Sequence, residues 1–290
     1  MVGSKKNNRL WVLLFLLPSL LGFSIFIAGP ILYSLGISFT DWDLLNPMKF
    51  VGISNYQKLI HDPNFWAALK NTVLFIIGYL PSVMAIGLFI ALLLNSKMHL
   101  KTLFRGIYFL PVVTSWVAVS LVWKWLFNPQ YGLINYGLSL IGIHGPNWLT
   151  DPHTAMIAII ITSVWKDIGF IMVLYLGGLQ SISPSLYEAA SIDGANAWHV
   201  FWKITLPMLK TTTFFVTIIS LINSFQVFDQ VNIMTEGGPG NATTVLVQNI
   251  YNHAFNYFEM GYAAAISWAL FLIIFLVSVI QIWGERRSKQ

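Results

Sequence analysis

The chain has 290 residues and is far more apolar than a soluble domain, since 56% of its residues are hydrophobic, 9% are charged, and 12 are Trp and 21 Phe. Soluble domains carry about 25% charged residues, so this composition excludes one and indicates a membrane protein. The lack of cysteine excludes a disulfide framework, a thiolate metal site and a cysteine nucleophile. The net charge of +5 lies in turns beside apolar segments, so it requires no nucleic acid as a partner.

Six apolar segments are long enough to cross a membrane, because a helix needs roughly 20 residues to span about 30 Å of hydrocarbon. We therefore predict an all-α membrane protein with six transmembrane helices in one polytopic domain. The segments are residues 11–39, 71–94, 106–127, 155–178, 211–232 and 260–283.

The first segment follows basic residues, as a secretory signal would. Residues 10–40 carry no charge, however, and that length exceeds the apolar region of a signal peptide. We therefore predict a retained helix. Pro18 and Pro30 lie inside it, where a kink is expected rather than a break because neighbouring helices can satisfy the freed carbonyl groups.

Basic residues near the ends of the spans set the orientation, because they accumulate on the cytoplasmic side. With a cytoplasmic amino terminus, eleven of the 16 Lys and Arg residues lie in cytoplasmic segments, which places both termini in the cytoplasm. The eleven are Lys5, Lys6, Arg9, Lys97, Lys101, Arg105, Lys203, Lys210, Arg286, Arg287 and Lys289.

The fourth span contains two charged neighbours, Lys166 and Asp167. A charged residue at the centre of a membrane helix costs about 2.5 to 3.5 kcal/mol on insertion scales and usually faces the bundle or a wet cavity. Adjacent helical positions point about 100° apart, so these two are poorly placed to neutralise each other. At least one should face a polar interior, and for Lys166 we favour a structural role.

The segment between the fourth and fifth spans reads as a short helix from about residue 185 to 193. Ser185 and Glu188 have the spacing of a capping box, and Pro184 suits the start of a helix. Gly194 can take the positive φ that ends a helix. Aromatic residues then recur at helical spacing up to Pro207, which predicts an amphipathic helix before the fifth span.

The fifth span carries uncharged polar residues at Ser220, Asn223, Gln226 and Gln230, within an arc of roughly 120° if the span is one helix. Hydroxyl-rich sugars require such amide donors and acceptors, so with Lys166 and Asp167 they form our set of substrate-path candidates. The alternative is structural, because Asn and Gln commonly hydrogen-bond across spans. For Asn223 and Gln226 we weigh the two alternatives evenly.

Residues 188 to 207 also fit a spaced pattern: Glu188-Ala189-Ala190, three residues, Gly194, nine residues, Ile204, one residue, then Leu206-Pro207. This pattern resembles the EAA loop of the integral-membrane subunits of bacterial ABC importers. In that family the loop forms a cytoplasmic coupling helix that docks into a groove on the ATPase. The coupling residues that the resemblance implies are Glu188, Ala189, Ala190, Asp193, Gly194, Ile204, Leu206 and Pro207.

Other stretches are similar to carbohydrate-type ABC permeases, among them Gly177-Gly178-Leu179-Gln180, Thr235-Glu236-Gly237-Gly238-Pro239 and Gly261-Tyr262-Ala263-Ala264-Ala265. The chain departs from the family where Glu236 stands in place of a common Gly. The resemblance implies a type I ABC importer permease fold, with an amino-terminal part (1–69), a five-helix core (70–283) that includes the EAA loop (185–207), and a tail (284–290). The first span would wrap a partner subunit.

The resemblance also implies the partners of the chain in the bilayer of a bacterial or archaeal plasma membrane. They are a second permease subunit in a heterodimer, a dimer of ABC ATPases and an extracytoplasmic sugar-binding protein. The sequence has no GxxxxGK[ST] loop, so ATP and Mg²⁺ belong to the partner ATPase, and we expect the chain to bind neither a cofactor nor a metal and to be no enzyme.

Two other functional classes are alternatives to the permease of an ABC importer. An ion-coupled secondary transporter of a small polar solute needs carboxylates inside the membrane, for which Asp167 and Asp229 are the only support. A membrane-embedded enzyme would need a catalytic pattern such as HExxH or GxSxG, which the sequence lacks.

Overall fold

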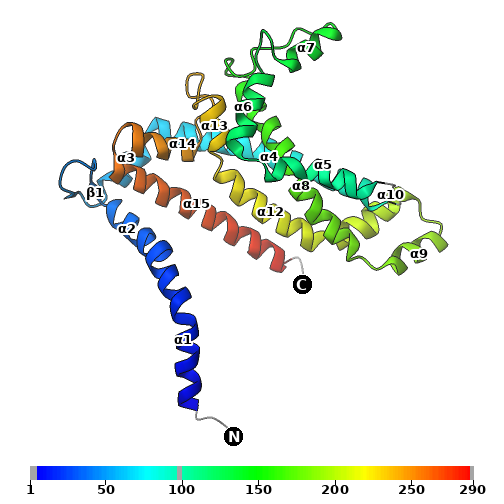
Figure 1. Ribbon diagram of the computed structural model, residues 1–290, viewed down its shortest axis with the longest axis horizontal. Helices are drawn as coiled ribbons and strands as arrows, with labels where there is room; N and C mark the ends of the chain where they lie inside the picture. Colours follow the sequence, from blue (N-terminus) through cyan, green and yellow to red (C-terminus); the bar gives the residue numbers. More distant parts are fainter. Residues whose placement is uncertain (1–4, 97–99, 288–290) are drawn as a thin grey trace. The chain divides into compact units, whose positions relative to one another are not determined.

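The computed structural model describes residues 5–96 and 100–287. It divides the chain into two compact units, one of Met1–Asp62 with Ile250–Phe271 and one of Pro63–Asn249 with Leu272–Gln290. Nearly all of the described chain is helical (Figure 1). The side chains of five basic residues counted above for the orientation (Lys5, Lys6, Arg9, Arg286, Arg287), and all of Lys97 and Lys289, lie outside what the structure describes.

The first unit contains one long amino-terminal helix followed by short elements. Its elements are α1 (Lys5–Phe23), the π-helical turn η1 (Ser24–Ala28), α2 (Gly29–Ile37), β1 (Thr40–Asp41), β2 (Lys49–Phe50), α3 (Ser54–His61), the end of α14 (Leu246–Tyr251), the π-helical turn η3 (Asn252–Asn256) and the start of α15 (Met260–Arg287). The two strands pair antiparallel, with Thr40 opposite Phe50.

The first predicted span is one helix with an irregular turn. Its stretch Leu14–Ile37 is long and apolar enough to cross a membrane, and none of its most apolar window is buried within the chain. The π-helical turn ends just before Pro30, where the Gly29 N–H donates to the Ser24 carbonyl. Proline supplies no N–H to the preceding turn, so the ladder is rearranged there, whereas α1 continues through Pro18.

A polar cluster joins the short elements of the first unit. Glu259 accepts hydrogen bonds from Lys58 Nζ (3.0 and 3.1 Å) and pairs with His253 Nδ1 (2.7 Å). Tyr262 donates to Asp62 (2.6 Å), and Lys58 lies 4.1 Å from the centroid of the Tyr262 ring. Burial raises the pKa of the Glu259 carboxyl, but the bonds from Lys58 and His253 outweigh burial and leave that pKa below its usual value.

The second unit contains the remaining helices. They are α4 (Pro63–Asn95), α5 (Lys101–Val113), α6 (Trp116–Leu126), α7 (Leu133–Leu140), α8 (Ala155–Gln180), α9 (Pro184–Ile192), α10 (Ala197–Val200), the π-helical turn η2 (Phe201–Thr205), α11 (Leu206–Met208), α12 (Lys210–Phe225) and α13 (Asp229–Met234). Helices α4 and α8 pack along each other, and α12 packs against both. Their shared core includes Phe75, Val83, Met172, Tyr175 and Val216.

Glycine lets helices α5 and α8 approach closely. A Cβ on Gly169 of α8 would lie 1.9 Å from the Tyr108 carbonyl oxygen of α5, which is far below any real contact. The backbones therefore touch at this point, in the manner of small-residue contacts between membrane helices. This contact holds α5 at the middle of α8, close to Lys166 and Asp167.

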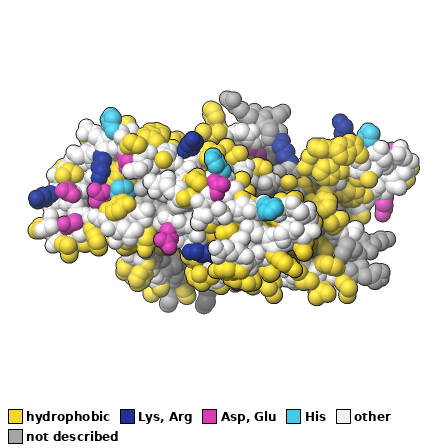
Figure 2. Space-filling view, turned by 90° about the horizontal axis from the view of Figure 1, so that it is seen from above, with side chains coloured by type: hydrophobic (Ala, Val, Ile, Leu, Met, Phe, Trp, Pro, Cys, Tyr) yellow, Lys and Arg dark blue, Asp and Glu magenta, His cyan; other side chains and the backbone are white. Residues whose placement is uncertain are grey.

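Within the described residues, four helices are long and apolar enough to span a membrane, and up to six spans result if two bent pairs each count as one. The predicted spans 71–94, 155–178 and 260–283 are confirmed as parts of α4, α8 and α15. Figure 2 shows hydrophobic side chains spread over one face between scattered acidic, basic and histidine side chains, and large hydrophobic residues are exposed along the long helices, among them Leu32, Ile77 and Phe275. Such a surface suits lipid or partner helices rather than water.

Two of the predicted spans are not single straight helices. The third, 106–127, is bent by 99° between α5 and α6, because Thr114 and Ser115 are extended and Ser115 caps α6 by accepting from the Val117 N–H. The fifth, 211–232, ends at Phe225 and resumes at Asp229 as the short α13. Both breaks occur in the second unit.

Candidate functional site

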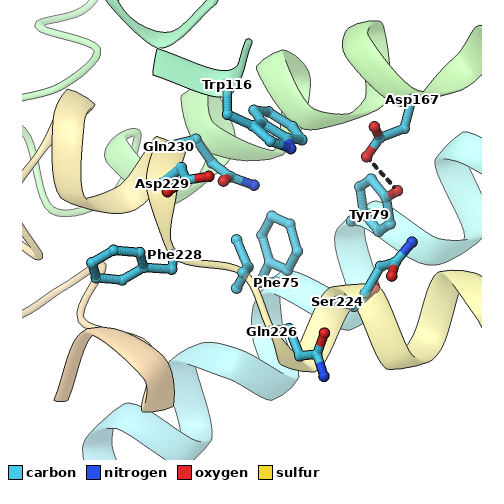
Figure 3. Close-up of a pocket in the computed structure, with 11 residues that line it drawn as sticks. Phe75, Tyr79, Trp116, Asp167, Ser224, Gln226, Phe228, Asp229 and Gln230 are labelled. Carbon is cyan, nitrogen blue, oxygen red and sulfur yellow. Dashed lines mark hydrogen bonds between the residues drawn. The ribbon is translucent and has the colours of Figure 1, made fainter. Parts of the chain in front are cut away.

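A pocket of about 270 Å³ opens where the two broken spans meet α4 and α8 (Figure 3). Its lining comes from α4, the start of α6, α8, and the stretch that joins α12 to α13. The lining residues are Phe75, Tyr79, Trp116, Asp167, Asn223, Ser224, Gln226, Val227, Phe228, Asp229 and Gln230.

Tyr79 and Asp167 form the polar wall of this pocket. The Tyr79 hydroxyl donates to Asp167 Oδ2 at 2.8 Å, joining α4 to α8 across 88 positions of sequence. The Tyr79 side chain is buried and stacks on Phe75, with ring centroids 5.2 Å apart. The tyrosine is therefore rigid, and it fixes the Asp167 carboxylate toward the pocket, as the dashed line in Figure 3 shows.

Asn223 and Gln226 also line the pocket, at the end of α12. Both are exposed, and within the part of the chain that the structure describes neither side chain has a hydrogen-bond partner. The Gln226 N–H caps α12 by donating to the Asn223 carbonyl (3.1 Å). Two amide side chains are thus left free to exchange hydrogen bonds with a ligand.

The arc of polar residues predicted on the fifth span is only partly right. Asn223, Gln226 and Gln230 do line one pocket, but the break after Phe225 brings them together, and they do not share one helical face. Ser220 is buried and does not line the pocket. Gln230 is buried as well and donates to Ser163 of α8 at 3.1 Å, so it also ties α13 to α8.

Lys166 lies behind the pocket wall. It is buried, it donates to the Val112 carbonyl at 3.1 Å, and its Nζ lies 4.7 Å from the centroid of the Trp116 ring. The ammonium therefore satisfies a carbonyl at the end of α5 and holds the aromatic residue that begins α6. It stabilises the bend between the two helices, which is a structural role.

The EAA-like motif begins on α9, and its helix caps differ from the predicted ones. The capping box at Ser185 is wrong: Ser183 is the N-cap, Pro184 occupies the first turn, and the two hydroxyls of Ser183 and Ser185 bond each other at 2.8 Å. At the other end the prediction is confirmed, because Gly194 has φ +71°. The Ala195 N–H donates to the Ala190 carbonyl (2.9 Å) and the Gly194 N–H to the Ser191 carbonyl (3.2 Å), which makes a Schellman motif.

Most of the motif faces outward. Glu188, Ala189, Asp193 and Gly194 are exposed, whereas Ala190 is buried against the chain. A hollow of about 370 Å³ lies beside the helix and is lined in part by Glu188, Tyr187 and Asn95. The small face of α9 thus leaves room beside an exposed carboxylate.

The second half of the motif belongs to a helix of three elements, α10, η2 and α11. Asn196 caps it by accepting from the His199 N–H at 2.9 Å. The Tyr187 hydroxyl lies 3.3 Å from Thr205 Oγ1 and joins α9 to this helix. Ile204 and Leu206 are half-buried and Pro207 is exposed within the helix, and α12 begins at Lys210, one residue before the predicted start of the fifth span at residue 211.

Several residues of these surfaces escaped the sequence analysis. Tyr79 and Trp116 line the pocket, although in the sequence they look like ordinary aromatic residues of apolar spans. Ile192 is the last residue of α9, two positions before Gly194, and it is 87% exposed. Among the described residues no group of three or more His, Cys, Asp or Glu could hold a metal ion.

Comparisons with known proteins identify the class. A family model described as binding-protein-dependent transport system inner membrane component matches residues 83–290. The lactose transport system permease protein LacF of Rhizobium radiobacter is 41% identical over 283 residues, which are 95% of this chain and 94% of that protein. The multiple sugar-binding transport system permease protein MsmF of Streptococcus mutans is 38% identical over 280 residues, 96% of each chain.

A solved structure agrees. The crystal structure of a bacterial ABC transporter involved in the import of alginate contains a chain that superimposes with a TM-score of 0.85, at 26% identity and over 99% of both chains. The fold is therefore that of a permease of an ABC importer. This chain belongs to the family of the inner membrane components of binding-protein-dependent transport systems, so it is a multi-pass protein of the inner membrane and not itself an ATPase.

Proposed function

We propose that this permease serves a sugar importer, forms half of its translocation path and couples that path to a separate ATPase through residues 185–207. The substrate class rests on relatives named for lactose and multiple sugars over nearly the whole chain. It also rests on the pocket, since free amides at Asn223 and Gln226 beside aromatic rings suit hydroxyl groups and the apolar faces of a sugar ring.

The exposed surface of α9 supports the coupling role. Glu188 can meet a basic residue of the ATPase, and Ile192 can enter an apolar hollow on it, whereas the hollow beside α9 can receive a side chain from the partner. ATP and Mg²⁺ are then bound by the ATPase dimer. Because the ATPase lies in the cytoplasm, the proposed orientation has α9 and both termini on the cytoplasmic side.

The apolar surface of the first span supports a further partner. Its most apolar window is not buried within the chain, so a second, different permease subunit would lie against it within the bilayer. An extracytoplasmic binding protein would deliver the sugar from the other side.

The test is reconstitution of the chain with its partner permease, its ATPase and a sugar-loaded binding protein in liposomes. Hydrolysis of ATP should require all partners and should rise when the loaded binding protein is added. A chain that takes up sugar in response to an ion gradient alone, without ATPase, would refute the proposal. Reporter fusions after Gly3 and Gly240 test the orientation, and they should report the cytoplasm and the outside respectively.

A further inference from the structure

The charge of the pocket narrows the kind of sugar that it accepts. Two lining residues, Asp167 and Asp229, are acids, and of the described residues that line the pocket none is Lys or Arg. The remaining polar lining is uncharged. The pocket thus presents carboxylate oxygens and amides to any solute that enters it.

Lys166 directly precedes Asp167 in the sequence, but its side chain does not line the pocket. Its ammonium is buried, donates to the Val112 carbonyl and lies 4.7 Å from the centroid of the Trp116 ring. It offsets part of the charge of Asp167, which is its neighbour on α8. One further carboxylate remains.

Asp229 supplies that carboxylate. It is the first residue of α13, it is exposed, and no ion pair to it occurs among the described residues. Lys124 of α6 donates to the Ile233 carbonyl of α13 (3.0 Å) and is not among the residues that line the pocket. The charged residues that line the pocket are therefore all acidic, and a cleft with low-dielectric walls that is lined by one sign of charge concentrates the field.

We propose that Asp167 and Asp229 are specificity-determining residues, which make the pocket accept uncharged or amino-bearing saccharides and reject acidic ones. This inference rests on the proposed function of the pocket as the sugar path. A carboxylate can accept hydrogen bonds from sugar hydroxyls or from an ammonium group, whereas a uronate would place like charges together in a site of low dielectric.

The lack of native cysteine allows a direct measurement of the pocket charge. We would introduce Asn223→Cys in the assembled transporter and compare its rates of reaction with a cationic and an anionic methanethiosulfonate of similar size. The rate for each reagent is divided by the rate at which the same reagent reacts with a small thiol in solution. The fraction of ionised thiol affects both reagents equally, so the ratio of the two normalised rates reports the local potential alone.

The cationic reagent should react at least about tenfold faster after this normalisation, in line with the enrichment that charged clefts produce. The ratio should fall toward one when Asp167→Asn and Asp229→Asn are added. Ser139→Cys on the exposed helix α7 is the matched control, and its ratio should not respond to either change. A ratio near one in the parent, or one unchanged by both neutralising substitutions, would overturn the inference.

Protection by sugars separates this inference from the proposed function. Lactose or maltose should slow the labelling of Asn223→Cys, digalacturonate should not, and digalacturonate should become protective once both acids are neutralised. If neither neutral sugar protects while the rate ratio is high, the pocket is charged but is not the sugar path, so the proposed function fails. Equal protection by neutral and acidic sugars in the parent overturns the charge selection itself.

Discussion

The close contact of α5 and α8 predicts that Gly169→Ala will disrupt the pocket from behind. The added Cβ would lie 1.9 Å from the Tyr108 carbonyl oxygen, 2.7 Å from its carbon and 3.1 Å from Phe109 Cα. Carbon–oxygen contacts are normally at least about 3.3 Å long, so α5 must move away by about 1.4 Å. Because the obstacle is backbone, no side chain can rotate to relieve it.

The magnitude follows from two opposing effects. Replacing a helical Gly by Ala stabilises a helix by about 1 kcal/mol, and overpacking a core destabilises by about 1 to 3 kcal/mol or more. We expect the steric effect to dominate at Gly169, for a net loss of about 2 kcal/mol. Gly177 lies on the same helix with no atom within 4 Å of its added Cβ, so Gly177→Ala is the matched control and should be neutral or stabilising.

Both variants would be purified in the complete complex and compared by thermal unfolding in detergent and by sugar uptake in liposomes. Gly169→Ala should unfold several degrees lower than the parent. It should also transport less, because the displaced α5 carries Val112, whose carbonyl holds Lys166. If Gly169→Ala is as stable and as active as Gly177→Ala, the helices do not touch at Gly169 and the reasoning is refuted.

Three further predictions concern the turn at Gly194, the pocket and the polar cluster around Glu259. Gly194 has φ +71° with open space around it, so Gly194→Val should introduce about 1 to 2 kcal/mol of backbone strain and reduce sugar-stimulated ATP hydrolysis. Gly194→Asn should retain that hydrolysis. Equal activities of the two variants would contradict this prediction. Asn223→Leu and Gln226→Leu should each weaken sugar uptake several-fold, because each loses hydrogen bonds worth about 0.5 to 1.5 kcal/mol, and the yield of the complex should be unchanged. A reduced yield with normal uptake would show that the two side chains have a structural role instead. The pKa of Glu259 is lowered in the folded protein, so the Glu259 carboxylate stabilises the fold above its ordinary pKa of 4.5, and this stabilisation is lost as the pH falls below that value. The loss of thermal stability in acid should therefore be smaller in Glu259→Gln than in the parent. An unchanged pH profile would argue against the Lys58 contact.

The straight spans could be predicted from the sequence because each is a continuous apolar run with one physical solution in lipid. Residues 71–94, 155–178 and 260–283 all lie within single helices. The bend after Val113 could not be predicted in this way. Its carbonyl neighbour at Val112 is satisfied by Lys166, 54 positions away in the sequence, and local patterns hold no information about such a partner.

The start of α9 shows that a usable signal was passed over. Proline favours the first position of a helix, so Pro184 already indicates Ser183 as the N-cap, and the spacing from Ser185 to Glu188 was the weaker signal. Glu236 is a second such case. Its φ of +55° explains why glycine suits this position of the turn, because a residue with a side chain is strained at positive φ.

The polar pocket and the broken helices are one feature of this fold. A helix that stops within a membrane leaves carbonyl and N–H groups unpaired, and these are tolerated only where they are buried in protein or line a wet cavity. The break after α5 is followed by Trp116 and the break after α12 by Gln226, Val227 and Phe228, and all four residues line the same pocket. A straight α12 would have continued past Gln226 and closed this space. The helix-breaking positions therefore shape the pocket as much as the side chains that line it do.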